Sequence, residues 1–126
     1  MMKTALITGG TDGMGRVVAP KLAKAGFHVI VHGRSATRGA ETVAEIKAAG
    51  GSAEFMPSNF ARLSDIRRFA TEVKARHPRI DLLVNNAGIG TGPEGAPRET
   101  TDDGLEARFG INYLSGFLMN HLLKDA

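Results

Sequence analysis

Short apolar runs alternate with amphipathic stretches along this chain, and the alternation predicts a parallel sheet covered by helices. The first run, Ala5-Leu6-Ile7, has no polar face, which is typical of a strand buried on both sides. Val29-Ile30-Val31 and Leu82-Leu83-Val84 have the same character, and a shorter strand is expected over 53–56. The pattern therefore predicts an α/β fold with four strands in these segments.

Helical periodicity fills the segments between the strands. After the first strand, apolar residues return at helical spacing at Val17, Val18, Leu22 and Ala25. Gly26 is expected to end this first helix, and Pro20 lies inside it, where a proline removes a backbone hydrogen bond and predicts a kink.

Capping residues indicate where the later helices begin. Ser35 precedes an expected helix over 36–49, and Ser64 precedes one whose apolar face is Ile66, Phe69, Ala70 and Val73. Thr100-x-x-Asp103 has the form of a capping box for a last helix that runs to about Leu123.

Glycines separate the first strand from the first helix, at Gly9, Gly13 and Gly15. Such a turn brings backbone N–H groups and the positive end of a helix to one point, so that a diphosphate can approach without a Cβ in the way. The strand–turn–helix context favours dinucleotide binding, while an ordinary tight turn is the alternative.

The end of the second strand bears on the choice of dinucleotide. An Asp or Glu there would accept hydrogen bonds from the ribose hydroxyls, whereas a guanidinium can hold a 2′-phosphate. The segment His32-Gly33-Arg34-Ser35 contains no acid, so Arg34 favours NADP over NAD. Arg16 adds positive charge nearby, or is simply a solvated helix residue.

Length and composition narrow the remaining possibilities. The 126 residues form one domain at most, and the absence of Cys excludes disulfides, thiolate metal sites and a cysteine nucleophile. The formal charge of +3 is small and dispersed, which argues against nucleic-acid binding. Neither a secretory signal nor an apolar run of roughly 20 residues is present, so a soluble, cytoplasmic protein without a membrane partner is expected. His28 and His32 lack metal-like companions and are interpreted as strand residues, so no metal site is predicted.

Three ordered motifs resemble the short-chain dehydrogenase/reductase family. They are Thr8-Gly9-x-x-x-Gly13-Met14-Gly15, Asn85-Asn86-Ala87-Gly88 and Phe109-Gly110-Ile111-Asn112-Tyr113. The resemblance implies a Rossmann-type, doubly wound parallel sheet over residues 1–126. It also implies hydride transfer between a nicotinamide cofactor and a small-molecule carbonyl or alcohol.

The resemblance also assigns expected roles to individual residues. The diphosphate would lie against the glycine turn, the 2′-phosphate at Arg34, the adenine beside Asn59 and Phe60, and the ribose beside the Asn86 segment. Asn59 as a plain loop residue and Asn85 as a turn residue are the alternatives. The cofactor residues so expected are Thr8, Gly9, Thr11, Asp12, Gly13, Met14, Gly15, Arg34, Asn59, Phe60, Asn86, Ala87 and Gly88.

One residue, Asn112, matches a catalytic position of the family. The family Asn that Asn112 matches distorts its helix and holds a water of the proton relay, and we expect Asn112 to be buried and catalytic. The family proton donor is a Tyr with a Lys four positions later, helped by a Ser. The one tyrosine here, Tyr113, is followed at that spacing by Phe117, so it does not match that pair.

The resemblance covers about the first half of a family member, which leads to an expectation of a fold truncated after the fourth strand and the following helix. Such a chain would be inactive alone, and its fourth strand would be an open apolar edge prone to self-association. The alternative function is a non-catalytic module that binds dinucleotide or pairs through that edge.

Overall fold

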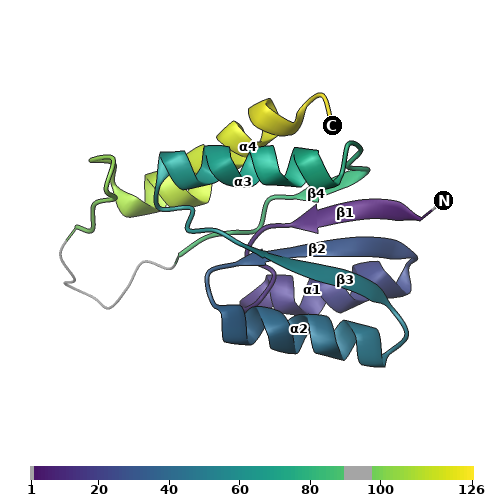
Figure 1. Ribbon diagram of the computed structural model, residues 1–126. Coiled ribbons are helices and arrows are strands. Elements are labelled where there is room, and N and C mark those ends of the chain that lie inside the picture. Colours follow the sequence, from purple (N-terminus) through teal and green to yellow (C-terminus); the bar gives the residue numbers. More distant parts are fainter. Residues whose placement is uncertain (1, 90–97) are drawn as a thin grey trace.

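A computed structural model describes residues 2–89 and 98–126 of the chain, which form a parallel sheet between two layers of helices (Figure 1). The sheet has four strands in the order β3-β2-β1-β4, and every pairing is parallel. The elements in chain order are β1 (Lys3–Ile7), α1 (Gly13–Lys24), β2 (Phe27–Gly33), α2 (Ala36–Ala48), β3 (Ser52–Pro57), α3 (Leu63–Arg76), β4 (Leu82–Val84), the π-helical η1 (Phe109–Leu114) and α4 (Ser115–Leu123).

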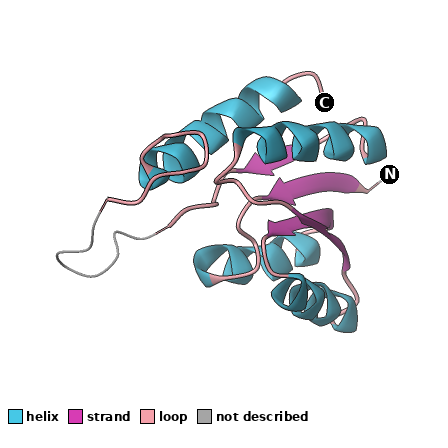
Figure 2. Cartoon of the chain, turned by 60° about the vertical axis from the view of Figure 1, so that its left-hand side comes forward, coloured by secondary structure: helices cyan, strands magenta, loops and turns pink. Residues whose placement is uncertain are grey.

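The helices cover both faces of the sheet, α1 and α2 on one face and α3 and α4 on the other (Figure 2). Successive strand residues point to opposite faces, so adjacent residues Leu6 and Ile7 of β1 belong to different halves of the core. The α3 and α4 half contains Leu6, Ile30, Met56, Ile66, Phe69, Val73, Met119 and Leu123, and the other half contains Ile7, Val29, Val31, Ala19 and Ile46. The sheet therefore has no solvent-facing side over β1 and β2, as their unbroken apolar runs predict.

Several boundaries agree closely with the sequence. The fourth strand spans the predicted apolar run, Leu82–Val84. The Ser35 side chain accepts a hydrogen bond from the backbone N–H of Arg38 and caps α2 as expected. Gly26, with φ +101°, follows the end of α1. The helix α1 continues through Pro20, so the proline does not end it.

The predicted caps of the last two helices were wrong. Helix α3 begins at Leu63, and the backbone N–H of Leu63 donates to Asp103 Oδ2 at 2.8 Å. Asp103 therefore caps α3 and does not belong to a capping box with Thr100, which forms an antiparallel bridge with Glu106 instead. The last helical segment begins at Ala107, where Glu106 Oε1 accepts from the N–H of Phe109 at 3.0 Å.

The last helix contains the distortion that the family resemblance implies, but Asn112 is not buried. Residues Phe109–Leu114 form a π-helix, and the N–H of Ser115 donates to the carbonyl of Gly110. Asn112 is exposed, and Phe109 and Tyr113 stack on each other at the surface with their ring centroids 5.6 Å apart. The expectation of a buried Asn112 fails because the buried face of this helix is formed by Gly110, Ser115, Met119 and Leu123.

Among the described residues, none of the helices combines the length and the apolar character needed to cross a membrane. The predicted cytoplasmic location stays a prediction.

Candidate functional site

A cleft of about 660 Å³ opens where the carboxyl ends of the parallel strands meet. Open α/β sheets bind their ligands at this edge. Four segments, each at or just after the carboxyl end of a strand, form most of its walls, and Ile111 of η1 completes the lining. The lining residues are Gly9, Thr11, Asp12, Gly13, Met14, His32, Gly33, Arg34, Ser35, Arg38, Asn59, Phe60, Ala61, Asn86, Ala87, Gly88, Ile89 and Ile111.

In the turn after β1, close packing requires glycine at two positions, and a third glycine faces open space. Gly9 has φ +64°, and a Cβ there would lie 2.8 Å from the Cα of Ala87. A Cβ on Gly15 would collide with the carbonyl of Gly9 and lie 2.5 Å from Asn86 Nδ2. Gly13, with φ +53°, has no described atom within 4 Å of that position. The turn is therefore tight against β4 and open toward the cleft at the N-terminus of α1.

Thr8 and Asn86 connect the turn to the end of β4. Thr8 Oγ1 accepts hydrogen bonds from the backbone N–H groups of Asn86 and Ala87, each at 3.0 Å. The Asn86 side chain donates from Nδ2 to the carbonyl of Gly9 at 3.0 Å. Both side chains fix the shape of the cleft, and Thr8, 1 % exposed, lies behind its wall.

Two arginines stand at the N-terminus of α2, beside the cleft. Arg34 is exposed and forms no ion pair with any residue that the structure describes. Arg38 Nη1 lies 3.1 Å from Asp12 Oδ2, while Asp12 Oδ1 accepts from the N–H of Gly13 at 2.9 Å. The acid of the cleft is thus already paired with a cation. This corner presents positive charge together with a helix N-terminus, both of which favour an anion.

His32, only 3 % exposed, lies beneath the glycine turn. Its Nδ1 accepts from the N–H of Gly9 at 3.0 Å, which requires Nδ1 to be unprotonated, so Nε2 carries the hydrogen and donates to the carbonyl of Ser58 at 3.1 Å. Burial lowers the pKa of His32 from 6.5 to about 4, although the hydrogen bond to Ser58 opposes that shift. The neutral imidazole therefore links the turn after β1 to the segment after β3.

The segment after β3 forms the opposite wall. Phe60 stacks on His32 with ring centroids 4.0 Å apart, and Asn59 Oδ1 accepts from the N–H of Ala61 at 3.0 Å. Asn59 therefore shapes its own loop through its side chain, and its Nδ2 is the group left to donate toward the cleft.

Asn112 holds the end of the segment that follows β4. Its Oδ1 accepts from the N–H of Ile89 at 2.7 Å, and its Nδ2 donates to the carbonyl of Ile89 at 2.9 Å. Asn85 turns away from the cleft and donates to Asn120 Oδ1 of α4 at 2.8 Å. Asn112 thus positions Ile89, which lines the cleft. Asn85 lies outside the lining, in agreement with its alternative interpretation as a structural turn residue.

The structure brings most of the predicted cofactor residues to one cleft, with Thr8, Gly15 and Asn112 just behind its walls. The cleft is also lined by residues that the sequence did not single out as site residues: His32, Gly33, Ser35, Arg38, Ala61, Ile89 and Ile111. The sequence contained a signal for Arg38, because it follows Arg34 by one helical turn and so lies on the same side of the helix. The role of His32 had none, since its partners lie 23 and 26 residues away.

The sequence matches the family model described as short chain dehydrogenase over residues 3–126. It is 41% identical over 126 residues to polyprenol dehydrogenase of Mus musculus, covering 98% of this chain and 36% of that protein. It is 36% identical to retinol dehydrogenase 13 of the same species, and the match covers 98% of this chain and 36% of that protein. The chain thus spans little more than a third of the length of these relatives.

Solved structures share the fold. A metagenomic short-chain oxidoreductase in complex with NADP superposes with a TM-score of 0.83 at 33% identity, over 97% of this chain and 55% of the other. The NADP complex of Pseudomonas aeruginosa RhlG gives a TM-score of 0.81 at 31% identity, and the match covers 98% of this chain and 47% of that one.

Proposed function

The chain belongs to the short-chain dehydrogenase family, and from this premise we propose that its cleft binds NADP as the cofactor-binding part of a carbonyl reductase or alcohol dehydrogenase. The observation that carries the proposal is that an open glycine turn lies in the same cleft as Arg34, which forms no ion pair with the residues that the structure describes. When bound, the nicotinamide would donate a hydride to the substrate carbon in its reduced form, NADPH, or accept one in its oxidised form, NADP⁺.

The diphosphate fits the glycine turn. The open space at Gly13 lies at the N-terminus of α1, where backbone N–H groups and the helix dipole favour an anion. Gly9 and Gly15 allow the turn to pack directly against the end of β4, which leaves the cleft side free for the ligand. Met14, 70% exposed, and Thr11 would flank the diphosphate.

The 2′-phosphate fits the corner at the N-terminus of α2. Arg34 would hold it, with the Ser35 segment and Arg38 as further donors. Arg38 would have to exchange its exposed ion pair with Asp12 for the phosphate, and an exposed ion pair is worth only about 0–1 kcal/mol. The preference for NADP rests on this corner.

The remaining residues accommodate the nucleosides. Asn59 and Phe60 would lie beside the adenine, and the Asn86–Gly88 segment would lie beside the nicotinamide ribose. Asn112, whose side-chain amide is engaged by Ile89, would act on catalysis by positioning that segment and the wide helical turn around itself. The names of the relatives, polyprenol and retinol dehydrogenase, support an alcohol or carbonyl substrate class.

Calorimetric titration with NADP and with NAD tests the proposal. A charge-assisted hydrogen bond contributes about 1.5–3 kcal/mol, so Arg34→Ala should weaken NADP binding by about 10- to 100-fold. NAD binding should change by less than about threefold, because NAD lacks the 2′-phosphate. Arg67→Ala, an exposed arginine of α3, is the matched control. Absence of NADP binding, or an equal loss for both nucleotides, would contradict the proposal.

A non-catalytic pairing module is the second candidate. In the described sheet β4 pairs with β1 alone, so its outer edge offers N–H and C=O groups to another strand. Phe109, Tyr113 and Phe117 are also exposed, at 49–63%. Sedimentation of the purified chain across a concentration series would detect such pairing, and a monomer at every concentration would exclude it.

A further inference from the structure

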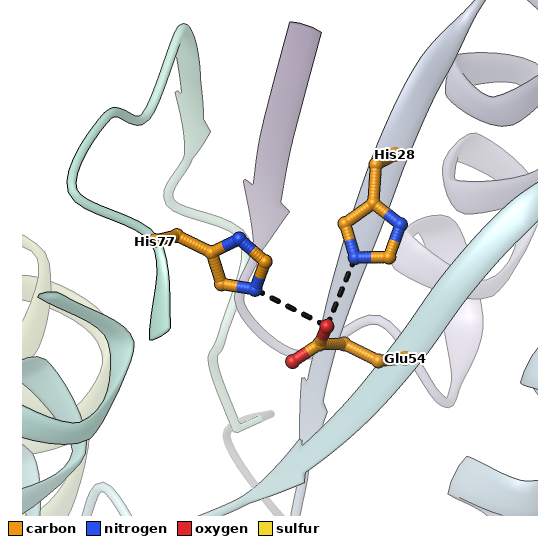
Figure 3. Close-up of side chains that lie close together, drawn as sticks. All are labelled: His28, Glu54 and His77. Atoms are coloured by element: carbon orange, nitrogen blue, oxygen red, sulfur yellow. Dashed lines mark hydrogen bonds and ion pairs between the residues drawn. The ribbon is translucent and has the colours of Figure 1, made fainter. Parts of the chain in front are cut away.

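A cluster of two histidines and one glutamate lies at the end of the sheet away from the cleft. His28 is the second residue of β2, Glu54 is in β3, and His77 directly follows α3 (Figure 3). The expectation that His28 has no metal-like companions was therefore wrong. In the parallel pairing His28 lies opposite Ser52, so Glu54, two residues on, points to the same face. The partners are 26 and 23 residues apart, which no local spacing reveals.

The ligand atoms already converge. Glu54 Oε2 lies 3.0 Å from His28 Nε2 and 3.1 Å from His77 Nε2, and all three ligand atoms are within 4.8 Å of one another. Around a tetrahedral zinc ion with bonds of 2.0–2.1 Å, neighbouring ligand atoms stand about 3.4 Å apart. The carboxylate would have to retreat from each imidazole by a few tenths of an ångström, and the two imidazole nitrogens, which lie within 4.8 Å of each other, would have to come to the same spacing. Small side-chain rotations would make both adjustments.

The surroundings orient His28 for coordination through Nε2. Its Nδ1 lies 2.6 Å from Ser52 Oγ, a partner to which a metal-bound imidazole can donate its remaining N–H. In the metal-free protein Nε2 donates its hydrogen to Glu54 Oε2, and a metal ion would take the place of that hydrogen while the contact with Ser52 keeps the ring oriented.

Glu54 is prepared to act as an anionic ligand. Its Oε2 faces both imidazoles, at 3.0 Å and 3.1 Å. Its second oxygen, Oε1, is buried and accepts no hydrogen bond from the described residues, with Arg76 Nη1 at 3.5 Å as its nearest cation. A divalent cation would satisfy this oxygen better than Arg76, whose side chain is 60% exposed.

We propose that His28, Glu54 and His77 bind a divalent transition-metal ion, Zn²⁺ in the first instance, with water completing the coordination. Two imidazoles and a carboxylate suit zinc and exclude a preference for Ca²⁺ or Mg²⁺, which take oxygen ligands. The side chains are 18–29% exposed, so an ion can reach them. The ion ties β2, β3 and the end of α3 together, away from the nucleotide cleft, and is independent of the proposed function.

Titration of the tag-free, metal-free protein with ZnCl₂, followed by calorimetry, tests the site, and CoCl₂ gives a parallel absorption readout. We expect one ion per chain at micromolar concentration and a higher unfolding midpoint with zinc. His77→Ala should weaken zinc binding by more than about tenfold, since loss of even an outer-shell partner costs 10- to 100-fold. His121→Ala, at an exposed histidine of α4, should bind as the parent does.

Arg76→Ala keeps the test informative if the histidine variants fold poorly, because Arg76 is exposed and lies in the last turn of α3. Removing its positive charge should tighten zinc binding severalfold. Absence of zinc binding at millimolar concentration, affinity that survives in His77→Ala, or affinity that does not rise in Arg76→Ala would each overturn the proposal.

Discussion

Acidification should destabilise this protein through His32, beginning before most of its carboxylates are protonated. The folded pKa of His32 is about 4 against an ordinary value of 6.5, so between these values the unfolded chain binds a proton that the folded chain refuses. The stabilisation due to the neutral imidazole is complete above pH 6.5 and is lost as the pH falls toward 4. The sign follows from burial: a charged imidazole would lie desolvated against the N–H of Gly9.

The magnitude follows from the two pKa values. Linkage gives a loss of about 1.3 kcal/mol between pH 7.5 and 5.5, and about 2.5 kcal/mol between pH 7.5 and 4.5. This is a large share of the roughly 5–15 kcal/mol that stabilises an ordinary domain. Urea unfolding at pH 7.5, 5.5 and 4.5, followed by circular dichroism, measures the free energy of unfolding at each pH.

A variant without the imidazole separates His32 from every other titrating group. In His32→Asn the amide oxygen can still accept from the N–H of Gly9, so the variant is less stable but its pH dependence should be flatter by about 2.5 kcal/mol over this range. The lowered pKa of Glu54, Asp81 and Glu106 affects both proteins alike. His121→Asn should keep the parental slope. If His32→Asn loses as much stability as the parent on acidification, the reasoning is refuted.

Two further substitutions test how the glycine turn is held. Thr8→Val removes the acceptor of two backbone N–H groups after β4 and should lower the free energy of unfolding by about 1–3 kcal/mol, whereas Thr71→Val on the exposed face of α3 should cost less than about 0.5 kcal/mol. Gly15→Ala forces a Cβ into the carbonyl of Gly9 and should cost about 3 kcal/mol, against about 1–2 kcal/mol for Gly13→Ala, where only the positive φ is strained. Urea titrations measure both pairs, and equal costs within either pair would contradict the packing described.

The sheet was predictable because its signals are local. The apolar runs at Ala5–Ile7 and Leu82–Val84 have no polar face, which is typical of strands in a covered sheet; the first is fully buried and the second is partly buried. Ser35 caps the helix immediately after it. The spacing of the glycines places the turn between strand and helix. The resemblance to a family then orders these elements around one cleft.

Most of the failures involve partners distant in the chain. Asp103 caps a helix 40 residues earlier, and Ser64, with ordinary capping chemistry, lies inside that helix. His32 lies in β2 as interpreted, but its connection of two walls of the cleft was not predicted, because its partners lie 23 and 26 residues away. Whether Asn112 is buried depends on the wide turn around it, which hydrophobic periodicity cannot register.

That wide turn contains one residue more than an ordinary helical turn, and the residues on both sides of it still face the core. Its inward positions run Ala107, Gly110, Ser115, Met119 and Leu123, so one step is five residues long where the others are three or four. With uniform 3.6-residue turns, Leu114 and Leu118 would face inward in place of Ser115 and Met119. A helix can accommodate one inserted or deleted residue by gaining or losing such a wide turn. The side chains of α4 beyond the turn then keep their packing against α3.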